Sequence, residues 1–213
     1  MKVLTFTLVA DGSSDRALIP LIEWLLTAKL AERPFAVQMA EGLPAWSNGL
    51  AARIRFAHEM YPCTALIVHR DCEAQPWTER LEQIQEAVSR LPIPHWIPVV
   101  PVRMTEAWLL FDQLSIRRAA GRPQDSVGLG LPRRQRWSAE PDPKGLLFAA
   151  LRTASGLSGR RLQKFDFNSA RVRVANLIDD FGYLRGMPCF DDFEGKLDAV
   201  IAKLDEVDCS ETA

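Results

Sequence analysis

The sequence has few of the features that mark stapled small domains or membrane proteins. It contains four cysteines in 213 residues, and no two of them have the spacing of a zinc knuckle or a redox pair. No stretch approaches the roughly 18 apolar residues needed to cross a bilayer. The start of the chain lacks a small-residue cleavage site, so it predicts a strand rather than a signal peptide. These absences predict a cytoplasmic protein without membrane contact, whose cysteines are reduced.

The formal net charge is only −1, but it hides an uneven distribution. Residues 1–116 carry 10 basic and 13 acidic side chains, residues 117–173 carry 13 and 4, and residues 174–213 carry 3 and 10. A strongly basic middle segment therefore lies between two acidic ones. This asymmetry predicts a surface that faces a polyanion. The alternative is that the acidic tail folds back on the basic segment and neutralises it.

The hydrophobic pattern alternates between strand and helix periods over the first hundred residues. Short apolar runs predict four strands, at residues 2–9, 35–39, 65–68 and 97–102. Helical spacing between the runs predicts a β-α-β-α-β-α-β order, which is typical of an α/β fold with a mostly parallel sheet flanked by helices. The third run is apolar throughout and predicts a central strand, whereas Pro98 and Pro101 place the fourth at an edge or a strand end.

The second half of the chain predicts a helical extension. Residues 121–142 are rich in proline, glycine and arginine and predict a long loop. Three helices follow, at about 142–155, 166–181 and 191–207. We expect residues 117–213 to pack on an α/β core formed by residues 1–116, so that the two segments make one compact unit.

Acidic residues follow the strands of the predicted sheet. Asp11 comes directly after the first strand, Asp71 and Glu73 follow the third, and Glu106 follows the fourth in an apolar context. Ligands of an open parallel sheet bind at the carboxyl ends of its strands, beside the topological switch point. If the first and third strands are neighbours, their acids converge. Carboxylate oxygens of this kind suit Mg²⁺ or Mn²⁺.

Each acid also has a structural interpretation. Taken by itself, Asp11 is better explained as the cap of a turn than as a metal ligand. Glu106 is also explained as an acidic residue in the first turn of a helix, where the helix dipole favours negative charge. The pair Asp71-x-Glu73 is more specific, because nothing structural requires two acids in three residues there. His69 and Arg70 fit a role in positioning phosphate or pairing with the acids.

Two segments resemble known motifs. Residues 9–15, Val-Ala-Asp-Gly-Ser-Ser-Asp, resemble the first motif of the Toprim family, in which an acid precedes glycine and a Ser-Asp pair opens the first helix. Residues 67–73 resemble the second, an Asp-x-Asp pair after the third strand. Later segments resemble a bacterial Toprim-like family whose members lie beside ABC-type ATPases, in the manner of the overcoming-lysogenization-defect nucleases and related phage-defence systems. The chain has Asp11 where Toprim proteins have Glu, and Glu73 where they have Asp.

The resemblance implies a nuclease that hydrolyses phosphodiester bonds in DNA or RNA with Mg²⁺ or Mn²⁺. Asp71 and Glu73 would hold the metal, and Glu106 would complete its shell. Asp11 would act as general base or acid, or as a further ligand. Lys144 would stabilise charge on the phosphate. The implied partners are nucleic acid and an ABC-type ATPase.

The basic segment supplies the implied nucleic-acid contacts. Arginines beside an aromatic ring are typical of surfaces that track a phosphate backbone and stack on a base. The residues in question are Arg70, Arg122, Arg133, Arg134, Arg136 and Trp137. Arg70 shares with Lys144 the charge-stabilising role. Neither Tyr61 nor Tyr183 is placed as a topoisomerase nucleophile, which favours hydrolysis over religation.

Two other interpretations remain open. The chain fits a catalytically inactive Toprim-like module that binds nucleic acid or a partner ATPase, with its altered acids as relics. A response-regulator receiver also places acids after the first and third strands. However, a receiver needs a lysine after its last strand, and this chain has Arg103-Met104-Thr105-Glu106 there.

Overall fold

The apolar runs of the first hundred residues form the strands of one sheet. A computed structural model describes residues 3–211, apart from the side chains of Gln135, Ser138 and residues 207–211. The four strands are parallel and lie in the order β2-β1-β3-β4. They are β1 (Leu4–Val9), β2 (Phe35–Met39), β3 (Ala65–His69) and β4 (Trp96–Val99). The predicted α/β fold with a parallel sheet flanked by helices is confirmed.

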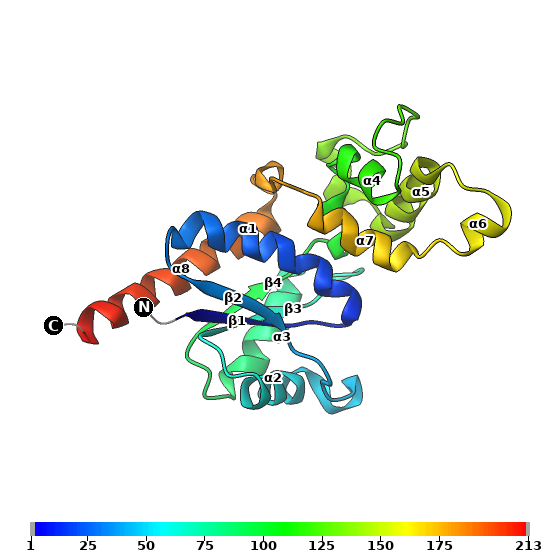
Figure 1. The fold of residues 1–213 in the computed structure, drawn as a ribbon. Coiled ribbons are helices and arrows are strands. Elements are labelled where there is room, and N and C mark those ends of the chain that lie inside the picture. Colours follow the sequence, from blue (N-terminus) through cyan, green and yellow to red (C-terminus); the bar gives the residue numbers. More distant parts are fainter. Residues whose placement is uncertain (1–2, 212–213) are drawn as a thin grey trace.

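Alternation along the strands divides the core into two layers. Leu8 and Ile67 belong to one buried hydrophobic cluster, and their chain neighbours Val9 and Val68 belong to the other, because successive side chains of a strand point to opposite faces. Helices α1 and α8 cover the first face, and α2 and α3 cover the second (Figure 1). These helices are α1 (Ile19–Leu30), α2 (Gly49–Met60), α3 (Trp77–Ser89) and α8 (Pro188–Glu211).

The strand order places a switch point between β1 and β3. From β1 the chain crosses to β2 on one side, whereas from β3 it crosses to β4 on the other. The register pairs Val9 with Val68, so the two strands end side by side. β3 is buried along its whole length, and Pro98 lies in the edge strand β4, as the sequence predicts. The acids that follow β1 and β3 therefore meet at one edge of the sheet.

A tight turn links β1 to its helix. Residues Ser13–Leu18 form the 3-10 helix η1, and α1 begins with Pro20 in its first turn. A separate 3-10 segment thus precedes the α-helix that follows β1. The Asp15 carboxylate accepts a hydrogen bond from the Gly12 backbone N–H at 2.9 Å, which holds the Asp15 side chain near the end of β1.

The second half of the chain is helical: residues 113–176 lie at the carboxyl end of the sheet, whereas α8 runs along its first face (Figure 1). Its predicted helix starts at Asp142 and Asp166 are confirmed as N-caps. The third helix begins earlier than predicted, at Pro188, because proline suits the first helical position. The shorter elements are η2 (Trp46–Asn48), η3 (Thr105–Leu109), α4 (Gln113–Ala119), η4 (Arg134–Ala139), α5 (Pro143–Ser155), α6 (Gly159–Gln163), α7 (Phe167–Asn176) and η5 (Gly182–Leu184).

Both halves contribute to the same hydrophobic core. Trp108 of η3 is fully buried and packs edge-on against Phe190 of α8, with ring centroids 5.5 Å apart. Helix α7 contacts η1, and α5 contacts η3. The helical extension thereby holds the two loops that carry the acids of the first and fourth strands. Within residues 3–211, no helix is both long and apolar enough to cross a membrane.

Candidate metal centre

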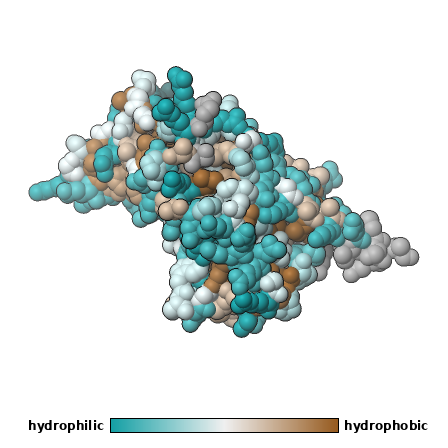
Figure 2. Space-filling view, turned by 180° about the vertical axis from the view of Figure 1, so that it is seen from behind, coloured by the Kyte–Doolittle hydropathy of each residue, from teal (hydrophilic) through white to brown (hydrophobic). Residues whose placement is uncertain are grey.

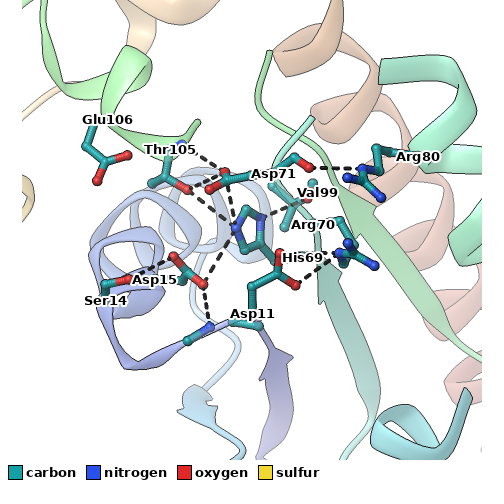
Figure 3. Close-up of polar contacts among 12 residues, drawn as sticks. Asp11, Ser14, Asp15, His69, Arg70, Asp71, Arg80, Val99, Thr105 and Glu106 are labelled. Carbon is teal, nitrogen blue, oxygen red and sulfur yellow. Dashed lines mark hydrogen bonds and ion pairs between the residues drawn. The ribbon is translucent and has the colours of Figure 1, made fainter. Parts of the chain in front are cut away.

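Three side chains that suit a metal ion lie together at the switch point. His69 ends β3, Asp71 follows two residues later, and Asp15 comes from η1. One ligand atom from each lies within 4.8 Å of the other two. Figure 3 shows both carboxylates turned toward the ring of His69. His69 shares the strand face of Ile67 by alternation, and this face looks toward the helix that follows β1.

Hydrogen bonding orients the His69 ring toward the carboxylates. Its Nδ1 lies 3.1 Å from the Val99 carbonyl oxygen, so in the neutral ring Nδ1–H donates there. Nε2 is then left with its lone pair, 3.4 Å from Asp71 and 3.8 Å from Asp15. A backbone carbonyl behind the ring is the usual partner of a metal-binding histidine. An imidazole beside two carboxylates is a mixed nitrogen and oxygen donor set, whereas Mg²⁺ prefers oxygen ligands alone.

Asp71 is held by the loop after β4. Its Oδ1 accepts hydrogen bonds from the Thr105 backbone N–H at 3.0 Å and from the Thr105 hydroxyl at 3.3 Å. Burial raises the pKa of Asp71 to about 6. The nearby His69 ring lowers this pKa, whereas the carboxylates of Asp15, Glu106 and Asp11 raise it further. Without a cation, a charged Asp71 is therefore unfavourable in the fold.

This raised pKa predicts a stability difference between the protein and Asp71→Asn. A carboxyl whose pKa is higher in the folded state stabilises the fold fully below about pH 4, and this contribution is lost as the pH rises through about 6. The asparagine does not titrate and keeps an oxygen for Thr105. In EDTA, the free energy of unfolding of the variant relative to the wild type should increase by roughly 3 kcal/mol between about pH 4 and pH 7. Urea unfolding across this range measures it, and a constant difference would contradict it.

Asp11 lies beside this cluster and pairs with Arg70. The Arg70 Nε donates to Asp11 Oδ2 at 3.3 Å and lies 3.1 Å from Oδ1. Oδ1 is buried and accepts no hydrogen bond from the residues that the structure describes. Burial raises the pKa of Asp11, while His69 and Arg70 act in the opposite direction. Among the described residues no backbone N–H donates to Asp11, so Asp11 does not cap the turn, and Arg70 is the cation that faces both of its carboxylate oxygens.

An open cavity adjoins the loop between Asp11 and Asp15. Its volume is about 350 Å³, which is in the range of small-ligand sites. Backbone from the ends of β1 and β2 lines it, together with the side chains of Arg16 and Arg53. The Arg53 guanidinium is buried and donates to the Ala10 carbonyl at 2.8 Å. The cavity borders the turn that carries Asp15, but none of Asp15, His69 and Asp71 is among its lining residues.

The structure does not bring Glu73 to this cluster. Residue 72 enters the core, and the chain then turns at Glu73 in the left-handed backbone region, with φ of 53°. The Glu73 side chain is 70% exposed and lies 3.6 Å from Arg80. The turn therefore separates the two acids of the Asp71-x-Glu73 pair, and only Asp71 faces the candidate centre.

Glu106 is buried but has a different partner. It forms an ion pair with Arg171 of α7, and both side chains are at least nine-tenths buried. Figure 3 shows Glu106 set apart from the three ligands, on the far side of Thr105. The apolar residues around Glu106 thus enclose its ion pair with Arg171, which joins η3 to α7, and Glu106 does not lie with the three candidate ligands.

The predicted nucleic-acid residues are spread over several environments. Trp137 is buried, and its Nε1–H donates to the Pro132 carbonyl at 3.1 Å, so its ring does not offer a surface for a base. Lys144 lies on α5, with Nζ 5.9 Å from the ring centroid of Phe148. The arginines lie as follows: Arg70 beside Asp11, Arg122 paired with Asp125 at 2.9 Å, Arg134 donating to the Arg185 carbonyl, and Arg133 and Arg136 lining a cavity of about 570 Å³.

The described side chains of the acidic tail, up to residue 206, make few ion pairs with the basic segment. Carboxylates of α8 pair with cations of α1 and of their own surroundings, such as Asp198 with Lys29 at 2.6 Å. Among residues 3–211, one ion pair within 4.0 Å joins residues 117–173 to residues 174–213, and it is Arg118–Asp179 at 3.9 Å. The alternative of internal neutralisation is therefore not what the described contacts show.

The sequence analysis did not include Asp15 among the candidate ligands and left the role of His69 open. Two signals were present. His69 and Asp71 are two residues apart at the end of a strand, a spacing that puts both on one face. Asp15 belongs to the Ser-Asp pair after the first strand, three residues from a glycine whose N–H it accepts.

Comparison with known proteins adds no further assignment. No protein-family model, curated protein or solved structure matches this chain. The resemblance to the Toprim family therefore rests on the two motifs and on the parallel sheet that carries them.

Proposed function

We propose that this protein is a metal-dependent phosphodiesterase that hydrolyses nucleic acid. The observation that carries the proposal is the cluster of Asp15, His69 and Asp71 at the carboxyl edge of a parallel sheet, beside its switch point. Three potential ligands face one another there, and the His69 ring has a carbonyl behind it. Mn²⁺ fits this donor set better than Mg²⁺.

The residues around the cluster have distinct roles in this proposal. The bound cation would polarise the phosphate and lower the pKa of a coordinated water. Asp11 has a raised pKa and a buried oxygen that accepts no hydrogen bond from the described residues, which suits it to accept a proton from the attacking water. Arg70 lies against Asp11 and would stabilise charge on the phosphate. Lys144 lies on α5, where its Nζ is 5.9 Å from the ring centroid of Phe148.

An activity assay tests the proposal. Purified protein should cleave a labelled DNA or RNA strand in the presence of Mn²⁺, more slowly with Mg²⁺, and not at all in EDTA. Cleavage that persists in EDTA would indicate metal-independent chemistry. No cleavage of either nucleic acid with any divalent cation would contradict the proposal.

A second candidate function is a Toprim-like module that binds without cutting. It is favoured by the outward position of Glu73 and by the engagement of Glu106 with Arg171, which leave the centre with fewer carboxylates than the motif implies. Such a module would bind nucleic acid or an ABC-type ATPase. Retained binding of an oligonucleotide with no turnover in Mn²⁺ would favour it over the first.

A further inference from the structure

A row of aromatic rings lies on the helical extension, away from the candidate metal centre. Phe148 of α5 and Phe167 of α7 have ring centroids 5.3 Å apart, and Phe165 packs against Phe167 at 4.8 Å. All three rings are only partly buried. Part of each aromatic surface therefore remains available to a ligand.

Cations surround this row. Lys144 Nζ lies 5.9 Å from the Phe148 centroid, and Arg152 Cζ lies 5.8 Å from the Phe167 centroid. Arg160 and Arg161 of α6 and the neighbouring Lys164 are exposed. None of these five cations has a carboxylate within 4.0 Å among the residues that the structure describes. We call the three rings and five cations the Phe–Arg surface.

The surroundings of the Phe–Arg surface leave its charge uncompensated. Residues 143–167 contain one acidic residue, Asp166. Its carboxylate caps α7 by accepting hydrogen bonds from the backbone N–H and the hydroxyl of Ser169. Helix α6 projects away from the body of the protein (Figure 1), and this end of the molecule is largely hydrophilic with hydrophobic patches interspersed (Figure 2). An extended anion can therefore reach these cations without displacing another element.

Charge and aromatic rings together point to a particular polyanion. Five uncompensated cations favour a phosphate backbone. Partly exposed rings favour unpaired bases, because bases stack on aromatic side chains when they are not already stacked within a duplex. An acidic peptide would pair with the cations but has no series of planar bases that could stack on the phenylalanine rings. Single-stranded nucleic acid satisfies both features.

We propose that the Phe–Arg surface binds the single-stranded nucleic acid on which the candidate metal centre acts. This inference rests on the proposed function and adds the form of the substrate. The elements that carry the surface also contact the site: α7 packs against η1, which carries Asp15, and α5 packs against η3, which carries Thr105. A strand held on α5–α7 is thus anchored to the same elements that position the ligands.

Binding of a fluorescent single-stranded oligonucleotide, followed by anisotropy in EDTA, tests this inference without catalysis. The double variant Arg160→Ala/Arg161→Ala should bind about tenfold more weakly, and the slope of log K against log salt should fall in magnitude by about 1.4, for two lost phosphate contacts. The matched control is Arg55→Ala/Lys203→Ala, which removes two exposed cations from α2 and α8. Equal affinity of the two double variants would overturn the proposal.

The aromatic part needs its own variant. Phe165→Leu keeps an apolar side chain but removes the ring, and it should weaken single-strand binding by about fivefold or more. Thermal unfolding checks that the variant is folded. A duplex of the same sequence should bind the wild type more weakly than the single strand. Tighter duplex binding, or equal competition by inorganic polyphosphate and by single strands, would show that charge alone acts and would overturn the proposal.

The outcomes separate this inference from the proposed function. Binding that depends on the Phe–Arg surface without any metal-dependent cleavage would contradict the nuclease and retain the binding surface. Cleavage that is unaffected by the arginine and phenylalanine variants would retain the nuclease and overturn the surface.

Discussion

Asp71→Asn is expected to lower the rate of Mn²⁺-dependent cleavage by at least roughly 10²–10³-fold, as the loss of several kcal/mol of metal-derived stabilisation implies. Asp71 is the candidate ligand that is placed most firmly, since Thr105 holds it through two hydrogen bonds and His69 lies 3.4 Å away. The asparagine can keep the bonds to Thr105 but cannot supply a negative charge. Single-turnover cleavage of a labelled strand measures the effect.

Glu73→Gln is the matched control, because it removes an equivalent charge from the same loop. The Glu73 side chain is mostly exposed and points to Arg80. The cleavage rate of the Glu73→Gln variant should therefore stay within about threefold of the wild type, as for other surface substitutions. Equal losses in both variants would mean that Glu73 reaches the metal, as the Toprim motif implies. An unchanged rate in Asp71→Asn would assign the cleavage to a contaminant.

The second large effect is expected on stability. Glu106→Ala should reduce the free energy of unfolding by about 3–5 kcal/mol, because it leaves the buried Arg171 guanidinium without a counter-charge. This is a large part of the total stability of an ordinary domain. Urea unfolding at neutral pH measures it. A loss below about 1 kcal/mol would show that water or another group compensates Arg171.

The double variant Glu106→Leu/Arg171→Met separates the two roles of Glu106. Replacing both members of a buried ion pair by apolar residues is often neutral or stabilising, so the double variant should recover most of the stability lost in Glu106→Ala. Its affinity for Mn²⁺ should equal that of the wild type, because Glu106 lies apart from the three ligands (Figure 3). A stable double variant that no longer binds Mn²⁺ would restore Glu106 to the metal shell.

The sheet was predictable because its signals are local. Apolar runs with alternating helical segments identified β1, β2, β3 and β4, and the prolines of the fourth run indicated an edge or a strand end, of which the structure shows the edge. The end of the second C-terminal helix was not predictable from periodicity, which continues past Asn176. There, Asp180 accepts the Gly182 backbone N–H at 2.7 Å and a new turn begins.

The candidate site was predictable only in part, because three-dimensional contacts select among its acids. Asp71 is identified by the motif and by its place two residues after His69, since alternate side chains of a strand share one face. The left-handed turn that directs Glu73 outward, the distant Arg171 that engages Glu106 and the packing that buries Trp137 depend on tertiary structure. Residues far apart in sequence decide each of these outcomes, so residue type and spacing alone did not reveal them.

The central claim is that Asp15, His69 and Asp71 together bind a divalent cation. Pulsed electron paramagnetic resonance of the protein titrated with Mn²⁺ tests it most directly, because nitrogen coupling reports an imidazole ligand. The account predicts one tightly bound Mn²⁺ with nitrogen coupling that His69→Gln abolishes, and loss of binding in Asp71→Asn. Tightly bound Mn²⁺ without nitrogen coupling, or no binding by the wild type, would contradict it.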